Sequence, residues 1–185
     1  MIRSMMFVPA DSEKKLAKAA SLAADALVLD LEDSVLPDRK PLARGMIKEY
    51  LAASSERARM WVRVNDLASG ELLKDLPAVV EARPAGIVLP KIRGPEDLQI
   101  VSTYLDALEA AYGVEAGAIG IVPVVTETPL SVLRLGETAR IACPRLRAMT
   151  WGGEDLSSAL GAGDPRDEHG AWRSMYAMAR NHCLL

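Results

Sequence analysis

The sequence predicts an α/β protein, and within that class a (β/α)8 TIM barrel of which the chain carries about six βα units. Three observations lead to this prediction. Short apolar runs alternate with amphipathic segments, no glycine-rich phosphate loop follows any run, and polar residues stand at the carboxyl end of nearly every run. A doubly wound sheet would gather such residues at one switch point, whereas a barrel builds its site from several strand ends.

Six apolar runs are the candidate strands. They are nearly continuous in Val, Ile, Leu and Met, which is typical of parallel strands buried on both faces. A barrel of typical size uses ~250 residues, so a chain of this length holds roughly six units. We therefore expect a single domain over residues 1–185, C-terminally incomplete, with the first and sixth strands at the edges of an open arc. The runs cover residues 4–9, 25–31, 60–65, 85–91, 118–127 and 146–152.

Two segments between these runs show the apolar face of a helix. One follows the first strand, and the other begins at Pro95, a residue favoured at the first position of a helix. The two faces consist of Leu16, Ala19, Ala20 and Ala23, and of Leu98, Val101, Leu105 and Leu108.

Composition excludes several classes of protein. Half of the residues are hydrophobic, a quarter are charged and the net charge is -3, with no basic stripe, so no nucleic-acid partner is expected. No stretch approaches a membrane span and the N-terminal apolar run is too short for a signal peptide, so we expect a cytoplasmic protein. With only His169 and His182, and with Cys143 and Cys183 far apart, zinc sites and histidine triads are not expected.

The second apolar run ends in a cluster of carboxylates. Strand alternation places Asp30 and Glu32 on one face, and Asp33 follows directly. Such charges at a buried strand end repel one another unless cations or hydrogen-bond donors are present. The alternative to a functional cluster is structural, in which Asp33 or Ser34 caps a turn and Asp30 pairs with a core arginine.

The third run ends with an arginine on the inward face. Trp61, Arg63 and Asn65 alternate in the sequence, so we expect them to share one face with Arg63 pointing toward the carboxylates. A guanidinium there suits the bidentate capture of a substrate carboxylate. An internal ion pair to Glu32 or Asp33 is the alternative, and both arrangements can hold at once.

The fourth run ends with Lys91, which has three possible roles. A lysine that forms a Schiff base needs a lowered pKa. An electrostatic clamp or a solvated strand end is the more common situation, and we favour these two.

The last two runs each lead to a carboxylate, Glu127 and Asp155. If their oxygens converge at the barrel mouth, the pair suits Mg²⁺, which keeps water and substrate oxygens as its other ligands. Gly152 and Gly153 allow a close backbone approach to a ligand and can present N–H donors to an anion. The alternative is a tight turn with Asp155 as the N-cap of a helix. We favour the metal, because one cation neutralises both carboxylates.

Together these residues resemble the citrate lyase β-subunit family of Mg²⁺-dependent CoA-ester lyases, which is related to the malyl-CoA and citramalyl-CoA lyases. Each motif alone is weak, but six in this order at βα spacing are specific. The resemblance covers almost the whole chain and rests on RSMMFVPA, on ADALVLDLEDSV followed by Lys40, Ala43 and Arg44, and on VRVN, VLPK, VTET and WGGEDLSSALG.

The resemblance implies a lyase that makes or cleaves the C–C bond between a 2-oxo acid, such as oxaloacetate, glyoxylate or pyruvate, and the acetyl group of acetyl-CoA. By the family pattern, Glu127 and Asp155 bind Mg²⁺, Arg63 and Glu127 contact the substrate, and Arg63 acts with the acidic pair Glu32 and Asp33 in catalysis. Family members have further C-terminal residues that supply an acidic catalytic group, often to a neighbouring subunit, and they form trimers or hexamers.

Two other functions remain open at this point. A Mg²⁺-dependent aldolase that acts on pyruvate and a free aldehyde would use the same metal carboxylates without a site for CoA. A non-catalytic, truncated relative would bind metal or partners without turnover. The sequence does not distinguish between the possible CoA esters.

Overall fold

Five parallel strands form one sheet in which strands that follow one another in the chain are neighbours in space. The structure is a computed structural model, and it describes residues 2–185. The order β1-β2-β3-β4-β5 has no reversal point, as in a barrel and unlike a doubly wound sheet. The predicted fold class is thereby confirmed. The strands are β1 (Met5–Pro9), β2 (Ala26–Asp30), β3 (Met60–Arg63), β4 (Gly86–Leu89) and β5 (Gly120–Pro123).

The predicted sixth strand lies beside β5 but is interrupted. Parallel bridges join Ile121 to Leu146 and Val124 to Thr150. Between these bridges β5 and its continuation advance by three residues and the sixth segment by four, so one residue is bulged out of the ladder. The bulge explains why the segment pairs with β5 without forming a continuous strand. Within residues 2–185 the sheet does not close, because β1 pairs only with β2.

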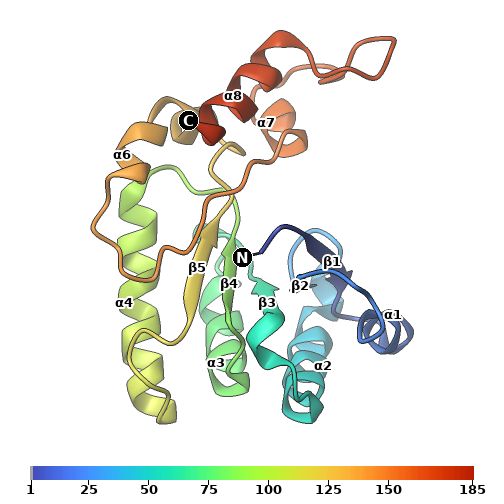
Figure 1. Ribbon diagram of the computed structural model, residues 1–185, viewed down its shortest axis with the longest axis vertical. Coiled ribbons are helices and arrows are strands. Elements are labelled where there is room, and N and C mark those ends of the chain that lie inside the picture. The colour runs from blue at the N-terminus through green and yellow to red at the C-terminus, as the bar shows by residue number, and fades with distance from the viewer. Residues whose placement is uncertain (1) are drawn as a thin grey trace.

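Helices cover the outer face of the sheet. Figure 1 shows α2, α3 and α4 packed side by side along it, while α7 and α8 lie beyond one end of the strands. None of the helices in the described part of the chain is long and apolar enough to cross a bilayer. The helices are α1 (Glu13–Ala19), α2 (Lys40–Ala53), α3 (Leu72–Ala82), α4 (Pro95–Tyr112), α5 (Pro129–Leu133), α6 (Leu135–Ala139), α7 (Glu154–Ala159) and α8 (Ser174–Leu184), with 3-10 turns η1 (Pro37–Arg39) and η2 (Arg57–Arg59).

The two predicted helical faces have different outcomes. In α4, which begins at Pro95, three of the four predicted residues are buried and Leu108 packs partly against the core. In α1 the prediction is correct for Leu16 and Ala19 and wrong for the other two alanines, which are exposed. The helix ends at Ala19 because a turn follows, in which both the backbone N–H and the hydroxyl of Ser21 donate to the carbonyl of Lys18.

The inner face of the sheet holds a second, smaller core. Trp61 lies across the glycines of the two next strands, and a Cβ at Gly86 would collide with its ring and with the backbone of Gly120. Trp61 and the surrounding valines form an apolar layer below the carboxyl ends of the strands. Its buried members are Ala26, Val28, Trp61, Val88, Val122 and Val124.

Asn65 does not share the inward face of Trp61 and Arg63, because β3 ends at Arg63. Its backbone N–H and its Nδ2 instead donate to Asp75 Oδ2 of α3, at 2.8 and 2.7 Å. Arg44 of α2 donates from Nε to the other oxygen of Asp75 at 2.7 Å. Lys40 donates to Asn65 Oδ1. The lysine and arginine of α2 therefore belong to a structural network that joins α2, α3 and the end of β3.

Replacing Asp75 by alanine should destabilise the protein strongly. The carboxylate is fully buried, and its loss would leave Nε of the largely buried Arg44 and two donors of Asn65 without this acceptor. We expect the free energy of unfolding in urea to fall by about 3–5 kcal/mol.

The matched control is Glu81→Ala, also in α3 and also paired with a cation of α2, Lys48, but at the surface. This change should cost less than about 1 kcal/mol. Similar losses in the two variants would contradict the structural importance of the buried network.

Candidate functional site

Arg63 and the carboxylates after β2 form a charge cluster at the carboxyl ends of β2 and β3. Asp30 and Arg63 are opposite one another in the sheet register, and the guanidinium donates from Nε and Nη2 to both Asp30 oxygens at 2.7 Å. Its Nη1 lies 2.8 Å from Glu32 Oε2 and 3.7 Å from Asp33 Oδ2. Glu32 Oε2 accepts no hydrogen bond from the described residues, so that contact is an ion pair only. The internal pairing is therefore present, with Asp30 as the main partner.

Lys91 connects the acidic groups of several strand ends. Its φ of 52° lies in the left-handed region that residues other than glycine rarely adopt. In this conformation its backbone N–H donates to Glu127 Oε2 at 2.6 Å, while its ammonium donates to Glu32. The same Nζ is 3.1 Å from Asp33 and 3.4 Å from Asp155 Oδ1. Unusual backbone conformations of this kind concentrate at functional sites, where the surroundings stabilise them.

Lys91 is a protonated amine, as expected for an electrostatic clamp and not for a lysine that forms a Schiff base. Burial alone lowers the pKa of Lys91, but the hydrogen bond and charge of Glu32, together with Asp33 and Asp155, raise this pKa above its ordinary value. A Schiff-base lysine needs a lowered pKa so that the free amine is available. The side chain is also only 28% exposed, so it is not a solvated strand end.

Glu127 and Asp155 converge on Lys91. Glu127 follows β5, is 5% exposed, and accepts one backbone hydrogen bond from Lys91. Asp155 lies in the first turn of α7, with its carboxylate beside the ammonium of the same lysine. Desolvation, together with the negative charges of Asp155 and Glu32, raises the pKa of Glu127 to about 8, although the backbone hydrogen bond and the charge of Lys91 act in the opposite direction. The positive charge near Glu127 is therefore too small to offset its burial and the neighbouring negative charges.

Glu32 has a similarly raised pKa. Its burial raises the pKa to about 7, and this effect outweighs the hydrogen bond from Lys91 and the charge of Arg63. Asp30 behaves in the opposite way, because the hydrogen bonds and charge of Arg63 overcome its burial and lower its pKa. In the metal-free site the pKa of Asp30 is therefore lowered, whereas the pKa values of Glu32 and Glu127 are raised toward neutral pH.

The glycine pair after the sixth segment has a structural reason. The N–H of Gly152 donates to Thr126 Oγ1, and that hydroxyl donates to the Gly152 carbonyl, both at 2.8 Å. This N–H is therefore not free for an anion. A Cβ at Gly152 would lie 3.0 Å from Glu127 Cγ and Oε1. Gly153, and not Asp155, is the N-cap residue of α7.

The arrangement of the two carboxylates fits a magnesium ion. Among the described residues no three His, Cys, Asp or Glu side chains form a cluster that holds a metal ion by itself. Two carboxylates at a mouth lined with other polar groups suit Mg²⁺, which takes one or two protein carboxylates and keeps water or substrate oxygens. The buried, undercompensated charge of Glu127 supports this assignment, because a cation there would remove the cost of its desolvation.

All five predicted site residues, Glu32, Asp33, Arg63, Glu127 and Asp155, lie around Lys91 or contact a residue that does. The sequence indicates Asp30 only as a possible partner of an arginine, whereas in the structure it belongs to the site as the main partner of Arg63. For Lys91 the sequence predicts only an electrostatic clamp or a solvated strand end, whereas in the structure its ammonium lies among three carboxylates. The signal for its role was present in the sequence, since a lysine at a strand end facing several acidic strand ends has an obvious set of partners.

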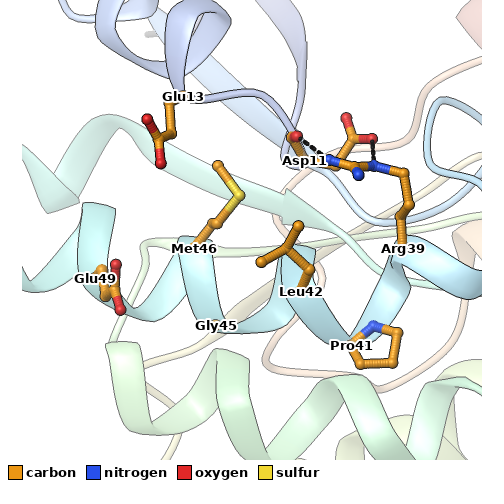
Figure 2. Close-up of a pocket in the computed structure, with 8 residues that line it drawn as sticks. All are labelled: Asp11, Glu13, Arg39, Pro41, Leu42, Gly45, Met46 and Glu49. Atoms are coloured by element: carbon orange, nitrogen blue, oxygen red, sulfur yellow. Dashed lines mark hydrogen bonds and ion pairs between the residues drawn. The ribbon is translucent and has the colours of Figure 1, made fainter.

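A separate cavity of about 560 Å³ lies outside the sheet, between α1 and α2, and Figure 2 shows its lining. None of the predicted site residues lines it. Its lining contains one ion pair, between Arg39 Nε and Asp11 Oδ2 at 2.7 Å. We place the functional site at the charge cluster, because within residues 2–185 only this cluster brings together buried titratable groups from several strand ends.

The raised pKa of Glu127 predicts a pH dependence of stability in the metal-free protein. The folded state holds a proton up to about pH 8, whereas the unfolded chain releases it near pH 4.5. The resulting stabilisation is complete below the unfolded value, declines as the pH rises and is lost above about 8. We expect the free energy of unfolding in EDTA to fall across this window, by up to about 1.4 kcal/mol per pH unit for one proton.

Glu127→Gln should flatten this decline, leaving the smaller contribution of Glu32. Glu115→Gln, which changes an exposed carboxylate far from the cluster, is the control and should keep the wild-type slope. Urea titrations between pH 5 and 8 provide the measurement. A wild-type stability that rises over this range would show that the Glu127 pKa is not raised.

The chain is similar to several known proteins. The chain is 35% identical over 162 residues to a (3S)-malyl-CoA thioesterase of Cereibacter sphaeroides, a match that covers 86% of this chain and 52% of that protein. It is 33% identical over 179 residues to the mitochondrial citramalyl-CoA lyase of Rattus norvegicus, covering 89% of this chain and 51% of that one. The chain therefore spans about half the length of these relatives.

A solved structure shares the fold. It is the crystal structure of protein CitE from Mycobacterium tuberculosis in complex with magnesium, acetoacetate and coenzyme A, with a TM-score of 0.79 and 29% sequence identity. The match covers 97% of this chain and 59% of that one. The family model described as HpcH/HpaI aldolase/citrate lyase matches residues 3–184. The chain belongs to the HpcH/HpaI aldolase/citrate lyase family.

Proposed function

We propose that the protein is a Mg²⁺-dependent carbon–carbon lyase that makes or cleaves the bond between a 2-oxo acid and the acetyl group of acetyl-CoA. The observation that carries this proposal is the convergence of Glu127 and Asp155 on Lys91, directly beside the Arg63 cluster. The names of the similar proteins support it, since two act on malyl-CoA or citramalyl-CoA and the third binds magnesium, acetoacetate and coenzyme A.

In this proposal Glu127 and Asp155 hold the metal ion. When bound, Mg²⁺ supplies Lewis-acid polarisation of the oxo-acid carbonyl and stabilises its negative oxygen. Arg63 binds the acid carboxylate or the enolate oxygen through Nη1, because its Nε and Nη2 are occupied by Asp30. Glu32 and Asp33 hold this guanidinium in place from the other side, and Glu32 also holds the ammonium of Lys91.

An aldolase acting on pyruvate and a free aldehyde is the second candidate. The description of the matching family includes aldolases, and the metal carboxylates would serve both reactions. The two functions differ in their need for CoA. Cleavage of a malyl-, citramalyl- or citryl-CoA thioester by the protein, with no turnover of the free hydroxy acid, would support the lyase and exclude the aldolase.

We also propose that the chain works in the cytoplasm as a homo-oligomer, a trimer or hexamer. The support for assembly is an apolar surface over α5, α7 and α8. Leu133 and Met178, which are 82% and 55% exposed, lie on this surface with Met175 and Leu160. Exposed apolar groups that gather in one place are typical of interaction surfaces.

Metal binding provides the first test. Mn²⁺, an oxygen-seeking probe for Mg²⁺ sites, should bind the protein and be displaced by Mg²⁺, as followed by electron paramagnetic resonance. Glu127→Gln and Asp155→Asn should each weaken the affinity more than about tenfold, because each removes a ligand. Glu154→Gln is the matched control, since this neighbouring carboxylate is 72% exposed, and its affinity should not change. Equal affinities in all variants would refute the assigned ligands.

Arg63→Lys provides the second test. Lysine keeps the positive charge but loses the planar fork that connects Asp30, Glu32 and the substrate. With a malyl- or citramalyl-CoA substrate we expect kcat/KM to fall on the order of 10²-fold while the Mn²⁺ affinity stays close to wild type. Circular dichroism checks that the variant is folded. Wild-type turnover by Arg63→Lys would remove Arg63 from the reaction.

A further inference from the structure

The two glycines that precede Asp155 separate the candidate metal site from an aromatic cluster. On one side, a Cβ at Gly152 would lie 3.0 Å from Glu127. On the other side, a Cβ at Gly153 would lie 2.7 Å from Cη2 and Cζ3 of Trp172 and 3.0 Å from Cζ3 of Trp151. The backbone therefore passes between a carboxylate and two indole rings, with no room for a side chain on either face.

Glycine is required at Gly153 by this contact and not by the backbone conformation. Its φ of -107° and ψ of -27° are ordinary values for any residue. The close contact is with two outer carbons of a large ring, which is itself fixed by its neighbours. Trp172 meets Trp151 edge-on, with ring centroids 5.1 Å apart, and lies 6.0 Å from the ring of the buried Tyr176.

Trp172 also anchors a hairpin. It forms an antiparallel bridge with Arg166, whose guanidinium stacks on the indole at 3.8 Å from the ring centroid. Arg166 in turn lies 3.5 Å from the carboxylate of Glu154, the first residue of α7. The hairpin thus fixes the position of the indole, and the indole packs against the turn at which α7 begins.

We propose that Trp172 is a positioning residue for the metal site: by packing on Gly153 it holds the turn over residues 152–155 against Glu127 and so fixes the separation of the Glu127 and Asp155 carboxylates. The inference rests on the proposed function, because it takes these two carboxylates as the metal ligands. Among the described residues Trp172 makes no hydrogen bond to either carboxylate, and its indole has no ligand atom for Mg²⁺, so we assign its effect to the packing on the backbone of Gly153.

A double-mutant cycle tests this role. Trp172→Ala removes the packing and should weaken Mn²⁺ binding about tenfold, a typical effect of groups that orient a ligand. Gly153→Ala should weaken it similarly, because the new methyl group displaces the indole. In the double variant the two closest contacts of the methyl group are gone and only Cζ3 of Trp151, at 3.0 Å, remains, so Gly153→Ala should add much less to the loss from Trp172→Ala than it costs alone. Trp172→Phe, which keeps an aromatic ring, should recover part of the affinity.

The control is Gly136→Ala in α6, where a Cβ would meet nothing within 4 Å, and its Mn²⁺ affinity should equal that of wild type. The same cycle is measured without metal by thermal unfolding, where Gly153→Ala should lower the melting temperature much more when Trp172 is present than when it is absent.

The possible outcomes are distinct. If wild type binds Mn²⁺ and Trp172→Ala binds it equally well, or if the two losses simply add, the positioning role is refuted while the proposed function stands. If wild type binds no Mn²⁺, both are refuted. Weakened binding with the expected non-additivity supports both.

Discussion

The buried carboxylates at the mouth of the sheet need positive charge, and the structure supplies it from neighbouring strands. Asp30 ends β2, Glu32 follows it, and both are almost fully buried, a situation that costs several kcal/mol for each unpaired charge. Arg63 at the end of β3 takes both oxygens of Asp30, and Lys91 after β4 holds Glu32. The acidic groups at the end of β2 are therefore paired with basic groups from the ends of the next two strands. Parallel pairing in chain order makes this possible, because it brings consecutive strand ends together at one edge.

This network does not extend to Glu127. The carboxylate receives a single backbone hydrogen bond, and Asp155 adds a second negative charge beside the same lysine. One ammonium is shared by three carboxylates, so the far side of the cluster has more negative than positive charge. The raised pKa of Glu127 expresses the same imbalance. A divalent cation is the simplest group that corrects it without further protein side chains, which is why the geometry and the proposed chemistry agree.

Packing and hydrogen bonds on several sides stabilise this cluster of buried charges. Below it, Trp61 and the inner valines exclude water. Behind it, the buried pair of Asp75 and Arg44 ties α2 and α3 to the end of β3. At the last strand, Thr126 and the glycine pair join the sixth segment to β5 while indole rings close the opposite side. The unusual backbone of Lys91 is stable because contacts to Glu127 and Glu32 fix both its main chain and its side chain.

The sequence by itself determined the fold class, the five strands, the inward position of Arg63 and the carboxylates that meet at the mouth. These follow from local patterns, because alternation fixes the face of a side chain and strand order fixes which ends are neighbours. Other features depended on contacts between distant residues, which no local pattern contains. Because β3 ends at Arg63, Asn65 leaves the inward face and donates a hydrogen bond to Asp75. A bulge interrupts the sixth strand. Only the tertiary structure decided that Asp30 is the partner of Arg63, because this depends on the register of β2 and β3. The packing of Trp172 on Gly153 likewise depends on how two separate segments approach each other.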